Sequence, residues 1–208
     1  MAVTKILEAV VEFNKKKVVD EVGAAVDAGI SIDDILNKGL IKAMDVVGEK
    51  FSRGEVFVPE MLQAAKAMQK GLEVIKPHLE SDALMEKGTV VIGTVKGDLH
   101  DIGKNLVTMM VEGAGFNVID LGVDVKTDKF VSEVQNHNAD VVCLSALLTT
   151  TMPVMAKTIE AFRESGLEAK VIIGGAPVTD AYAQQIGADG FSDNAPGAVE
   201  LIRRLINA

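Results

Sequence analysis

Residues 89–115 read TVVIGTVKGDLHDIGKNLVTMMVEGAG, and the fold can be predicted outward from this stretch. Segment 89–95 is short, apolar and rich in β-branched residues, as buried strands are. A polar turn follows at 96–103, and the apolar residues after it recur at helical spacing. The loop holds one histidine and two aspartates. Because ligands of open parallel sheets bind at the loops that follow the strands, this stretch predicts a ligand site.

The same alternation continues to the end of the chain. Apolar runs predict strands at 89–95, 117–121, 140–146, 170–174 and 190–192. Helical spacing predicts helices at 104–112, 127–136, 153–164, 178–185 and 196–206. Strands that alternate with helices predict an α/β fold with a parallel sheet covered on both faces. Five such units predict a flavodoxin-like (Rossmann-like), doubly wound sheet with strand order 2-1-3-4-5.

The N-terminal part of the chain has only helical patterns. Its apolar spacing indicates four helices, with Ser31 as the N-cap of the third and Pro59 in the first turn of the fourth. Four helices joined by short turns predict a small antiparallel bundle. The polar stretch 80–88 separates the two patterns. We therefore predict a helical cap domain at 1–87 and a sheet domain at 88–208.

Composition excludes several classes of protein. The chain has 208 residues and a formal net charge of −9, which argues against nucleic-acid binding because that requires a basic face. No run approaches the roughly 20 apolar residues that span a bilayer, and the N-terminus lacks a signal-peptide pattern. The lone cysteine, Cys143, forms no internal disulfide and is interpreted as a small buried strand residue. We expect a cytoplasmic protein with no membrane or nucleic-acid partner.

The predicted sheet brings three loops to one edge. The loop after the first strand carries Asp98, His100 and Gly103, and the loop after the third carries Ser145, Thr149, Thr150 and Thr151. The strand order makes these two loops neighbours at the switch point. Gly174 and Gly175 leave the fourth strand beside them, and paired glycines would let a flat group lie close to the backbone.

Metal ligation is the sharpest interpretation of His100. A neutral imidazole binds transition metals, and a carboxylate on its other nitrogen fixes the tautomer. Asp98 could supply that carboxylate; Asp101 could too, although it more naturally caps the following helix. A structural zinc site needs further ligands, and no Cys/His cluster supplies them. We therefore interpret His100 as the single protein ligand of a metal held mainly by another group, namely a macrocycle.

Other ligand classes fit this loop less well. His100-Asp101 resembles the dipeptide of metal-dependent phosphohydrolases, but these require further His and Asp residues on helices. No GxGxxG sequence follows a strand, and no GxxxxGK[ST] phosphate loop is present. A receiver domain requires a phosphorylatable aspartate at the end of the third strand, where this chain has Ser145-Ala146-Leu147.

Four segments together resemble one known family. Asp98-Leu99-His100-Asp101-Ile102-Gly103 resembles the DxHxxG signature of cobalamin-binding domains. The segment SALLTTT at 145–151 resembles the family's SxL…T segment, and Gly174-Gly175 resembles its GG segment. In the helical half, GEVFVPE at 54–60 is similar to the turn of the family's cap. The chain thus resembles the corrinoid proteins of methyltransferase systems and the cobalamin-binding module of methionine synthase.

The resemblance implies a role for each matching residue. His100 would be the lower axial ligand of cobalt, so that cobalamin binds in the base-off/His-on form. Asp98 would hydrogen-bond His100, and Thr151 occupies the position of the serine that ends this relay in methionine synthase. Phe57 of the cap would lie at the upper, methyl-bearing face. Met61, which shares a helical face with Met68, would either join Phe57 there or belong to the core of the bundle. The remaining cofactor-binding residues that it implies are Asp101, Ile102, Gly103, Ser145, Leu147, Thr149, Gly174 and Gly175.

The resemblance also implies a function. A chain with only a cap and a corrinoid domain would carry a methyl group from a substrate-specific methyltransferase to a second methyltransferase, which acts on tetrahydrofolate or coenzyme M. Accidental oxidation of the cobalt implies a reductive activating protein as a further partner. Two alternatives stay open: a cobalamin-binding regulator or sensor, and a subunit of a corrinoid mutase.

Overall fold

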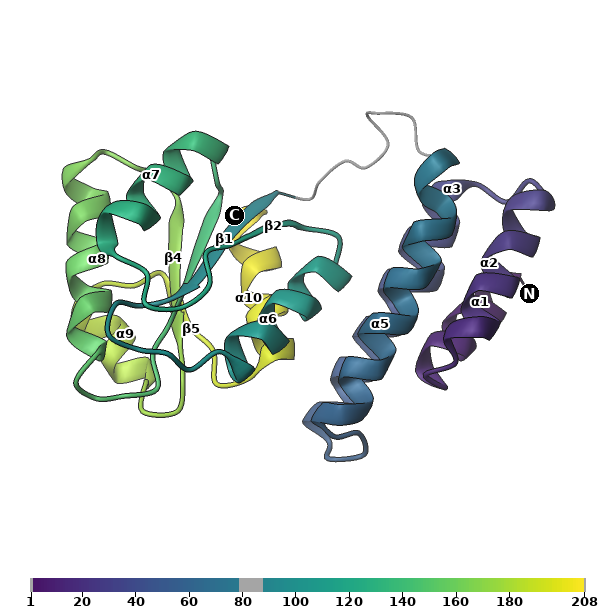
Figure 1. The fold of residues 1–208 in the computed structure, drawn as a ribbon, viewed down its shortest axis with the longest axis horizontal. Helices are drawn as coiled ribbons and strands as arrows, with labels where there is room; N and C mark the ends of the chain where they lie inside the picture. Colours follow the sequence, from purple (N-terminus) through teal and green to yellow (C-terminus); the bar gives the residue numbers. More distant parts are fainter. Residues whose placement is uncertain (1, 79–87, 208) are drawn as a thin grey trace. The chain divides into compact units, whose positions relative to one another are not determined.

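The computed structural model describes residues 2–78 and 88–207, which form two compact units (Figure 1). One unit contains the N-terminal helices, and the other contains the sheet with its helices. The predicted domain boundary at residue 87 lies outside the described residues, as does the predicted polar link at 80–88 except for Gly88.

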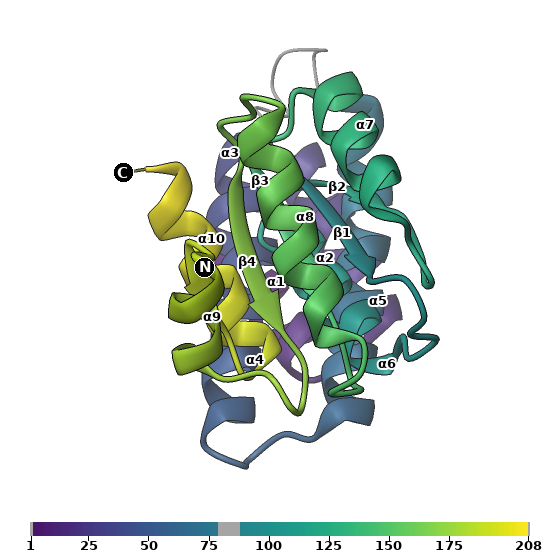
Figure 2. The ribbon, with the colours of Figure 1, turned by 90° about the vertical axis from the view of Figure 1, so that its left-hand side faces the viewer.

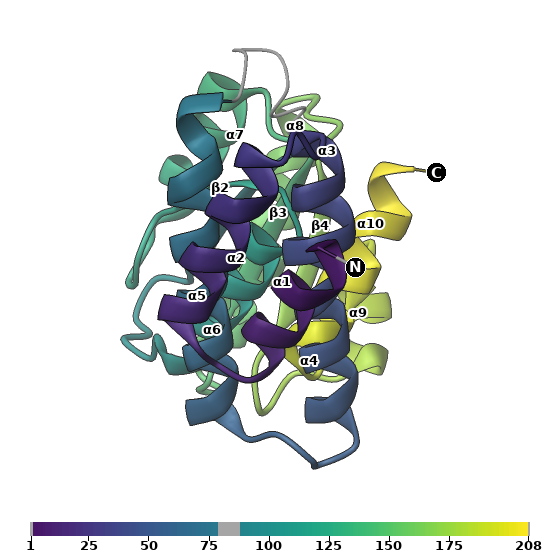
Figure 3. The same cartoon turned by 90° about the vertical axis from the view of Figure 1, so that its right-hand side faces the viewer.

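The helical unit contains the four predicted helices, which Figure 3 shows. They are α1 (Ala2–Val11), α2 (Lys15–Asp27), a continuous third helix, and α5 (Val58–Ile75), which runs into the short η2 (Lys76–His78). The third helix consists of α3 (Ile32–Asp34), the π-helical η1 (Ile35–Ile41) and α4 (Lys42–Ser52). Helix α1 packs against α2 and α4, and α5 packs against α2.

Capping and packing explain the course of the third helix. The Ser31 side chain accepts a hydrogen bond from the Asp34 N–H at 3.1 Å, which confirms the predicted N-cap. Gly39 lies within the π-helical stretch, where a Cβ would come within 3.2 Å of Ile6 Cγ2. Glycine therefore lets η1 approach α1 closely. The apolar core of this unit includes Ile6, Val10, Val18, Val22, Leu40, Val47 and Ile75.

The second unit has the predicted α/β fold. Its strands are β1 (Thr89–Thr94), β2 (Asn117–Asp120), β3 (Val141–Ser145), β4 (Lys170–Gly174) and β5 (Gly190–Phe191). All neighbouring strands are parallel, in the order β2-β1-β3-β4-β5, as predicted. The register places Thr94, Ser145 and Gly174 side by side at the carboxyl ends of three neighbouring strands.

Helices cover both faces of this sheet. Helices α7 (Thr127–His137), α8 (Met152–Glu164) and α9 (Asp180–Ile186) lie on one face, and α6 (Ile102–Gly113) and α10 (Ala195–Ile206) lie on the other (Figures 1 and 2). Helix α6 begins two residues before its predicted start, so Gly103 lies in its first turn and not in the preceding loop. Helix α9 begins later than predicted because Thr179 caps it, accepting from the Tyr182 N–H at 3.2 Å.

Burial explains why the sequences of the central strands are continuous apolar runs. Strands β1 and β3 are buried along nearly their whole length because helices cover both faces. Cys143 is buried in β3, as predicted, and burial raises the pKa of its thiol to about 12. Phe130 of α7 is fully buried and reaches over Gly93 of β1, where a Cβ would come within 2.8 Å of its ring. Across residues 2–78 and 88–207, no helix is both long and apolar enough to cross a membrane.

We expect Phe130→Ala to lower the free energy of unfolding of the sheet unit by about 3–5 kcal/mol, because it leaves a cavity over Gly93. Urea unfolding followed by tyrosine fluorescence measures this, since the single tyrosine, Tyr182, lies in this unit and the chain has no tryptophan. Leu99→Ala is the control, because this side chain is 72% exposed. Equal effects of the two substitutions would contradict the assignment of Phe130 to the core.

Candidate functional site

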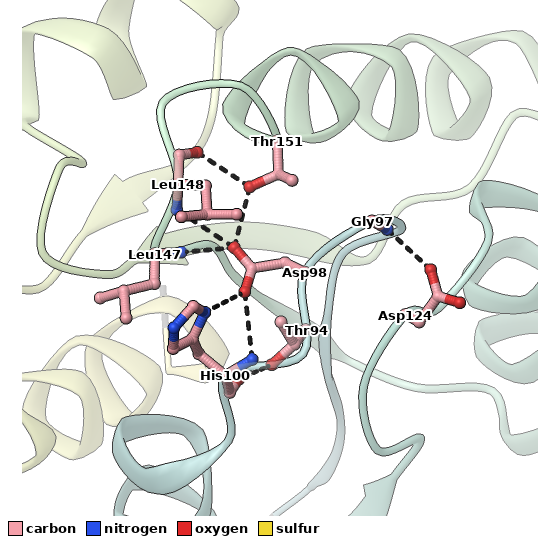
Figure 4. A network of polar contacts seen from close by, with 8 residues as sticks. All are labelled: Thr94, Gly97, Asp98, His100, Asp124, Leu147, Leu148 and Thr151. Carbon is pink, nitrogen blue, oxygen red and sulfur yellow. Dashed lines mark hydrogen bonds and ion pairs between the residues drawn. The ribbon is translucent and has the colours of Figure 1, made fainter.

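The site is centred on the carboxylate of Asp98, which follows β1 at the edge of the sheet where the strands end. This side chain is fully buried. Its two oxygens accept five hydrogen bonds, which come from its own loop, from the loop after β3 and from Thr151 at the start of α8 (Figure 4). The structure therefore joins the two loops that the strand order predicted to be neighbours.

Each oxygen of Asp98 faces a different partner. Oδ1 accepts from the His100 backbone N–H at 3.1 Å and lies 2.8 Å from His100 Nδ1. Oδ2 accepts from the backbone N–H groups of Leu147 at 2.7 Å and Leu148 at 3.2 Å, and from Thr151 Oγ1 at 2.8 Å. The hydrogen bond between Asp98 and His100 that the resemblance implied is thus present.

These donors determine the charge of Asp98. Burial by itself disfavours ionisation, but the hydrogen bonds from the Leu147 N–H, from the side-chain Nδ1 and the backbone N–H of His100, and from Thr151 outweigh it. Together they hold the pKa of the Asp98 carboxyl well below its ordinary value. Asp98 is therefore an ionised carboxylate at neutral pH although it is shielded from water.

The ionised carboxylate fixes the tautomer of His100. Because a carboxylate can only accept hydrogen bonds, Nδ1 must carry the proton in the contact with Asp98. The lone pair of the neutral ring is then on Nε2, which points away from Asp98 in Figure 4. The His100 side chain is 52% exposed, so this lone pair can be offered to a ligand. A fixed tautomer with a free Nε2 is the form in which histidine binds a metal.

Thr151 connects Asp98 to the start of α8. Its side chain is buried, and Oγ1 lies 2.8 Å from both Asp98 Oδ2 and the carbonyl oxygen of Leu148. A hydroxyl has one proton, whereas both of these partners are acceptors, so they compete for it. The hydrogen bonds that a His100–Asp98–Thr151 relay requires are present, and its part in ligand exchange stays a prediction.

Two residues that the sequence did not single out hold the loop that carries His100. The buried Thr94 donates from Oγ1 to the carbonyl oxygen of His100 at 2.8 Å. Asp124, from the link between β2 and α7, accepts from the Gly97 N–H at 2.7 Å. The only signals in the sequence were a hydroxyl at the end of an apolar strand and an acidic loop at the same edge of the sheet.

An ion pair with a buried lysine holds the helix that follows the loop. Lys104 of α6 is 3% exposed, and its Nζ binds Asp120 Oδ2 at the end of β2. Asp120 Oδ1 also accepts from the Gly122 N–H at 2.9 Å. This pair fastens the first turn of α6 to the sheet, next to the loop of His100. Sequence reasoning did not identify it, because the two charges are 16 residues apart.

Exposed apolar side chains accompany the half-exposed imidazole. Leu99 and Ile102 flank His100 in sequence and are 72% and 79% exposed. Leu147 and Leu148, whose backbones hold Asp98, are each 41% exposed. Large apolar side chains left in water around a polar group are typical of a ligand site.

The other residues predicted around His100 take different positions. Asp101 directly precedes α6, and its carboxylate accepts from the Asn105 side-chain amide at 3.1 Å. Gly103 is exposed, and a Cβ there would meet open space. Ser145 is half-buried at the end of β3, and Thr149 is exposed in the following turn.

The paired glycines have a packing role. A Cβ on Gly175 would come within 1.8 Å of the Ala146 carbonyl oxygen, and its φ of +130° is one that other residues rarely adopt. A Cβ on Gly174 would lie 3.0 Å from the Ser192 carbonyl oxygen. Close approach of backbone to backbone thus accounts for both glycines, and contact with a ligand is an additional prediction.

The two cap residues belong to the helical unit. Phe57 precedes α5 and is 65% exposed, so its ring is available for contact. Met61 lies in α5 and is fully buried. Their predicted place at the upper face of the cofactor stays a prediction.

We expect Asp98→Asn to destabilise the sheet unit by roughly 1.5–3 kcal/mol at neutral pH, because it removes charged hydrogen bonds. The folded-state pKa of Asp98 is lowered, so its contribution is complete above about pH 4, the ordinary pKa of an unfolded aspartate. The difference from wild type should shrink as the pH falls below that value. Urea unfolding over a pH series measures it, with the exposed Asp101→Asn as control; a difference that does not change with pH would contradict the assignment.

Both halves of the chain match families of known proteins. A protein family described as "B12 binding domain" matches residues 88–202, and a second family with the same description matches residues 2–76. A trimethylamine corrinoid protein of Methanosarcina barkeri is 41% identical over 209 residues, which cover 99% of this chain and 96% of the relative.

Two solved structures are also similar. A cobalamin-binding protein from Desulfitobacterium hafniense has a TM-score of 0.82 and 35% identity, with 98% of each chain covered. A chain of the methanol:cobalamin methyltransferase complex MtaBC from Methanosarcina barkeri has a TM-score of 0.89 and 31% identity, covering 100% of this chain and 80% of that one. With both halves matched, this chain belongs to the family of B12-binding corrinoid proteins.

Proposed function

We propose that this chain is a methyl carrier that binds cobalamin in the base-off/His-on form, with His100 as the lower ligand of cobalt. The observation that carries the proposal is the state of His100. Its Nδ1 is held by a buried carboxylate, and its Nε2 has no hydrogen-bond partner among the residues that the structure describes. That arrangement presents one lone pair in a fixed direction.

The surroundings of His100 fit a metal inside a macrocycle better than a metal held by the protein alone. In the described part of the chain, no group of three His, Cys, Asp or Glu side chains could hold a metal ion. The apolar side chains of Leu99, Ile102, Leu147 and Leu148 are instead exposed around the loop. They offer contacts to a large ring, and the open space at Gly103 leaves room for the nucleotide tail.

In methyl transfer, the cofactor and the residues of this chain would have different roles. A bound corrinoid supplies a cobalt centre that accepts and releases a methyl group. Asp98 holds the proton on Nδ1 and so keeps the Nε2 lone pair available. Thr151 and the Leu147 N–H hold Asp98 in place. A proton taken up by the His100–Asp98 pair would weaken ligation by His100 and favour its release.

We propose three partners. The first is a substrate-specific methyltransferase; in support of it, the similar chain from Methanosarcina barkeri belongs to a methanol:cobalamin methyltransferase complex. The second is a methyltransferase that passes the methyl group to tetrahydrofolate or coenzyme M. The third is a reductive activating protein. The net charge of −9 would favour docking to basic surfaces on these partners.

We expect wild-type protein mixed with hydroxocobalamin to keep a red chromophore through desalting. His100→Ala should lose most of the colour or show a shifted visible spectrum, because the ligand to cobalt is gone. His137→Ala is the matched control, because this half-exposed histidine lies on α7 beside Glu133. A colourless wild type would contradict cobalamin binding, and a His100→Ala spectrum identical to wild type would contradict ligation by His100.

Methyl transfer is tested with the loaded protein under a reductant. Trimethylamine, dimethylamine or methanol is added together with the methyltransferase subunit of a relative's system. We expect one of these pairs to change the visible spectrum of wild type, and His100→Ala to respond at least tenfold more slowly. If no pair does so while adenosylcobalamin binds tightly, the mutase or sensor alternatives replace the methyl carrier.

A further inference from the structure

Asp124 contacts the histidine loop from a segment outside the DxHxxG signature. It lies between β2 and α7, and its side chain is exposed. Its Oδ1 accepts from the Gly97 N–H at 2.7 Å, and its own N–H donates to the Asp98 carbonyl oxygen at 3.0 Å. Figure 4 shows the side chain directed at Gly97, on the opposite side of the loop from His100. Asp124 therefore binds the backbone of both Gly97 and Asp98, from which the Asp98 side chain extends.

The segment that carries Asp124 is itself fastened to the sheet. Val125 forms an isolated parallel bridge with Val95, and its N–H donates to the Thr94 carbonyl oxygen at 3.0 Å. Asp124 adopts a φ of +54°, in the left-handed region, and Gly97 has a φ of +85°. The left-handed turn lets Asp124 present both its N–H and its carboxylate to the loop. The contact is thus a rigid link from the sheet to the Gly97–Asp98 peptide.

Small displacements of that peptide would matter at His100. Asp98 accepts its five hydrogen bonds from groups on two backbone segments, its own loop and residues 147–151, so its carboxylate is held from both sides. The Asp98 N–H donates to the Val95 carbonyl oxygen at 3.1 Å on one side, and Asp124 holds the Asp98 carbonyl oxygen on the other. Without the side-chain hydrogen bond to Gly97, only the backbone N–H of residue 124 holds the loop on the side that faces away from the imidazole.

We infer that Asp124 is a positioning residue for His100: by holding the Gly97–Asp98 backbone, it keeps His100 in the Nδ1–H tautomer with Nε2 free for a metal. The consequence for cobalt ligation rests on the proposed function. The effect on the tautomer does not, because it is a property of the protein without cofactor. The Asp124 carboxylate points to Gly97 and away from the imidazole in Figure 4, so it acts through the loop.

The experiment compares three variants. Asp124→Gly removes the side chain yet tolerates the positive φ, so it does not introduce backbone strain. Asp124→Asn keeps an oxygen that can accept from the Gly97 N–H and also tolerates this φ. Asn138→Gly is the control for glycine at a positive φ, because Asn138 has a φ of +47° and is exposed at the end of α7.

The first readout is nitrogen NMR of His100 in the cofactor-free protein, at alkaline pH where a free imidazole is neutral. We expect wild type, Asp124→Asn and Asn138→Gly to show mainly the Nδ1–H tautomer, and Asp124→Gly to show a mixture of both tautomers. The second readout is cobalamin retention and its visible spectrum. Here Asp124→Gly should bind about tenfold more weakly, as expected when a group that supports a metal ligand is lost, and Asp124→Asn should restore binding.

Two results would overturn the inference. Asp124→Gly could keep the wild-type tautomer and spectrum, in which case the hydrogen bond to Gly97 does not position His100. Alternatively, Asp124→Asn could behave like Asp124→Gly, in which case charge and not the hydrogen bond to Gly97 is what matters. If wild type itself fails to bind cobalamin, the proposed function falls, and the tautomer measurement still decides the role of Asp124.

Discussion

The carboxylate of Asp98 is the constraint on which the site depends. A buried carboxylate is costly unless hydrogen bonds compensate for lost water, and here five donors do so. Because three of these donors belong to residues 147–151, Asp98 holds the loop after β3 against the loop after β1. The carboxylate also places the proton of His100 on Nδ1. One buried charge therefore organises two loops and determines which nitrogen of the histidine faces outward.

The topology of the sheet makes this arrangement possible. Strands β1 and β3 are neighbours although β2 lies between them in sequence, so their loops meet at the carboxyl edge. Parallel strands buried on both faces give that edge a rigid base. Gly175 allows the exit of β4 to pack on the Ala146 carbonyl group, which closes the edge beside the same loops. The position of His100, on which the proposed function depends, is thus determined by loops that the sheet holds in place.

Several contacts that do not involve the imidazole hold the loop of His100. Thr94 binds the His100 carbonyl oxygen, and Lys104 with Asp120 fastens the helix that follows. Such backbone anchors limit the movement of the imidazole when a ligand binds or leaves. The leucines and Ile102 around it are exposed and so available for contact with a ligand. A fixed imidazole with exposed apolar side chains around it suits a large ligand that the protein holds through one nitrogen, Nε2 of His100.

The sequence by itself was sufficient for the α/β class, the strand order and the four N-terminal helices, because periodicity carries that information. Spacing left Asp98 and Asp101 both open as partners of His100, and the family resemblance pointed to Asp98. The sequence did not indicate the π-helical stretch at 35–41 or that Gly103 lies inside α6. Nor did it indicate the backbone donors of the site, because Gly97 meets Asp124 across 27 residues and Asp98 meets Leu147 across 49. Only the tertiary structure decides such contacts, since any residue can offer a backbone N–H and its partner depends on how the loops come together.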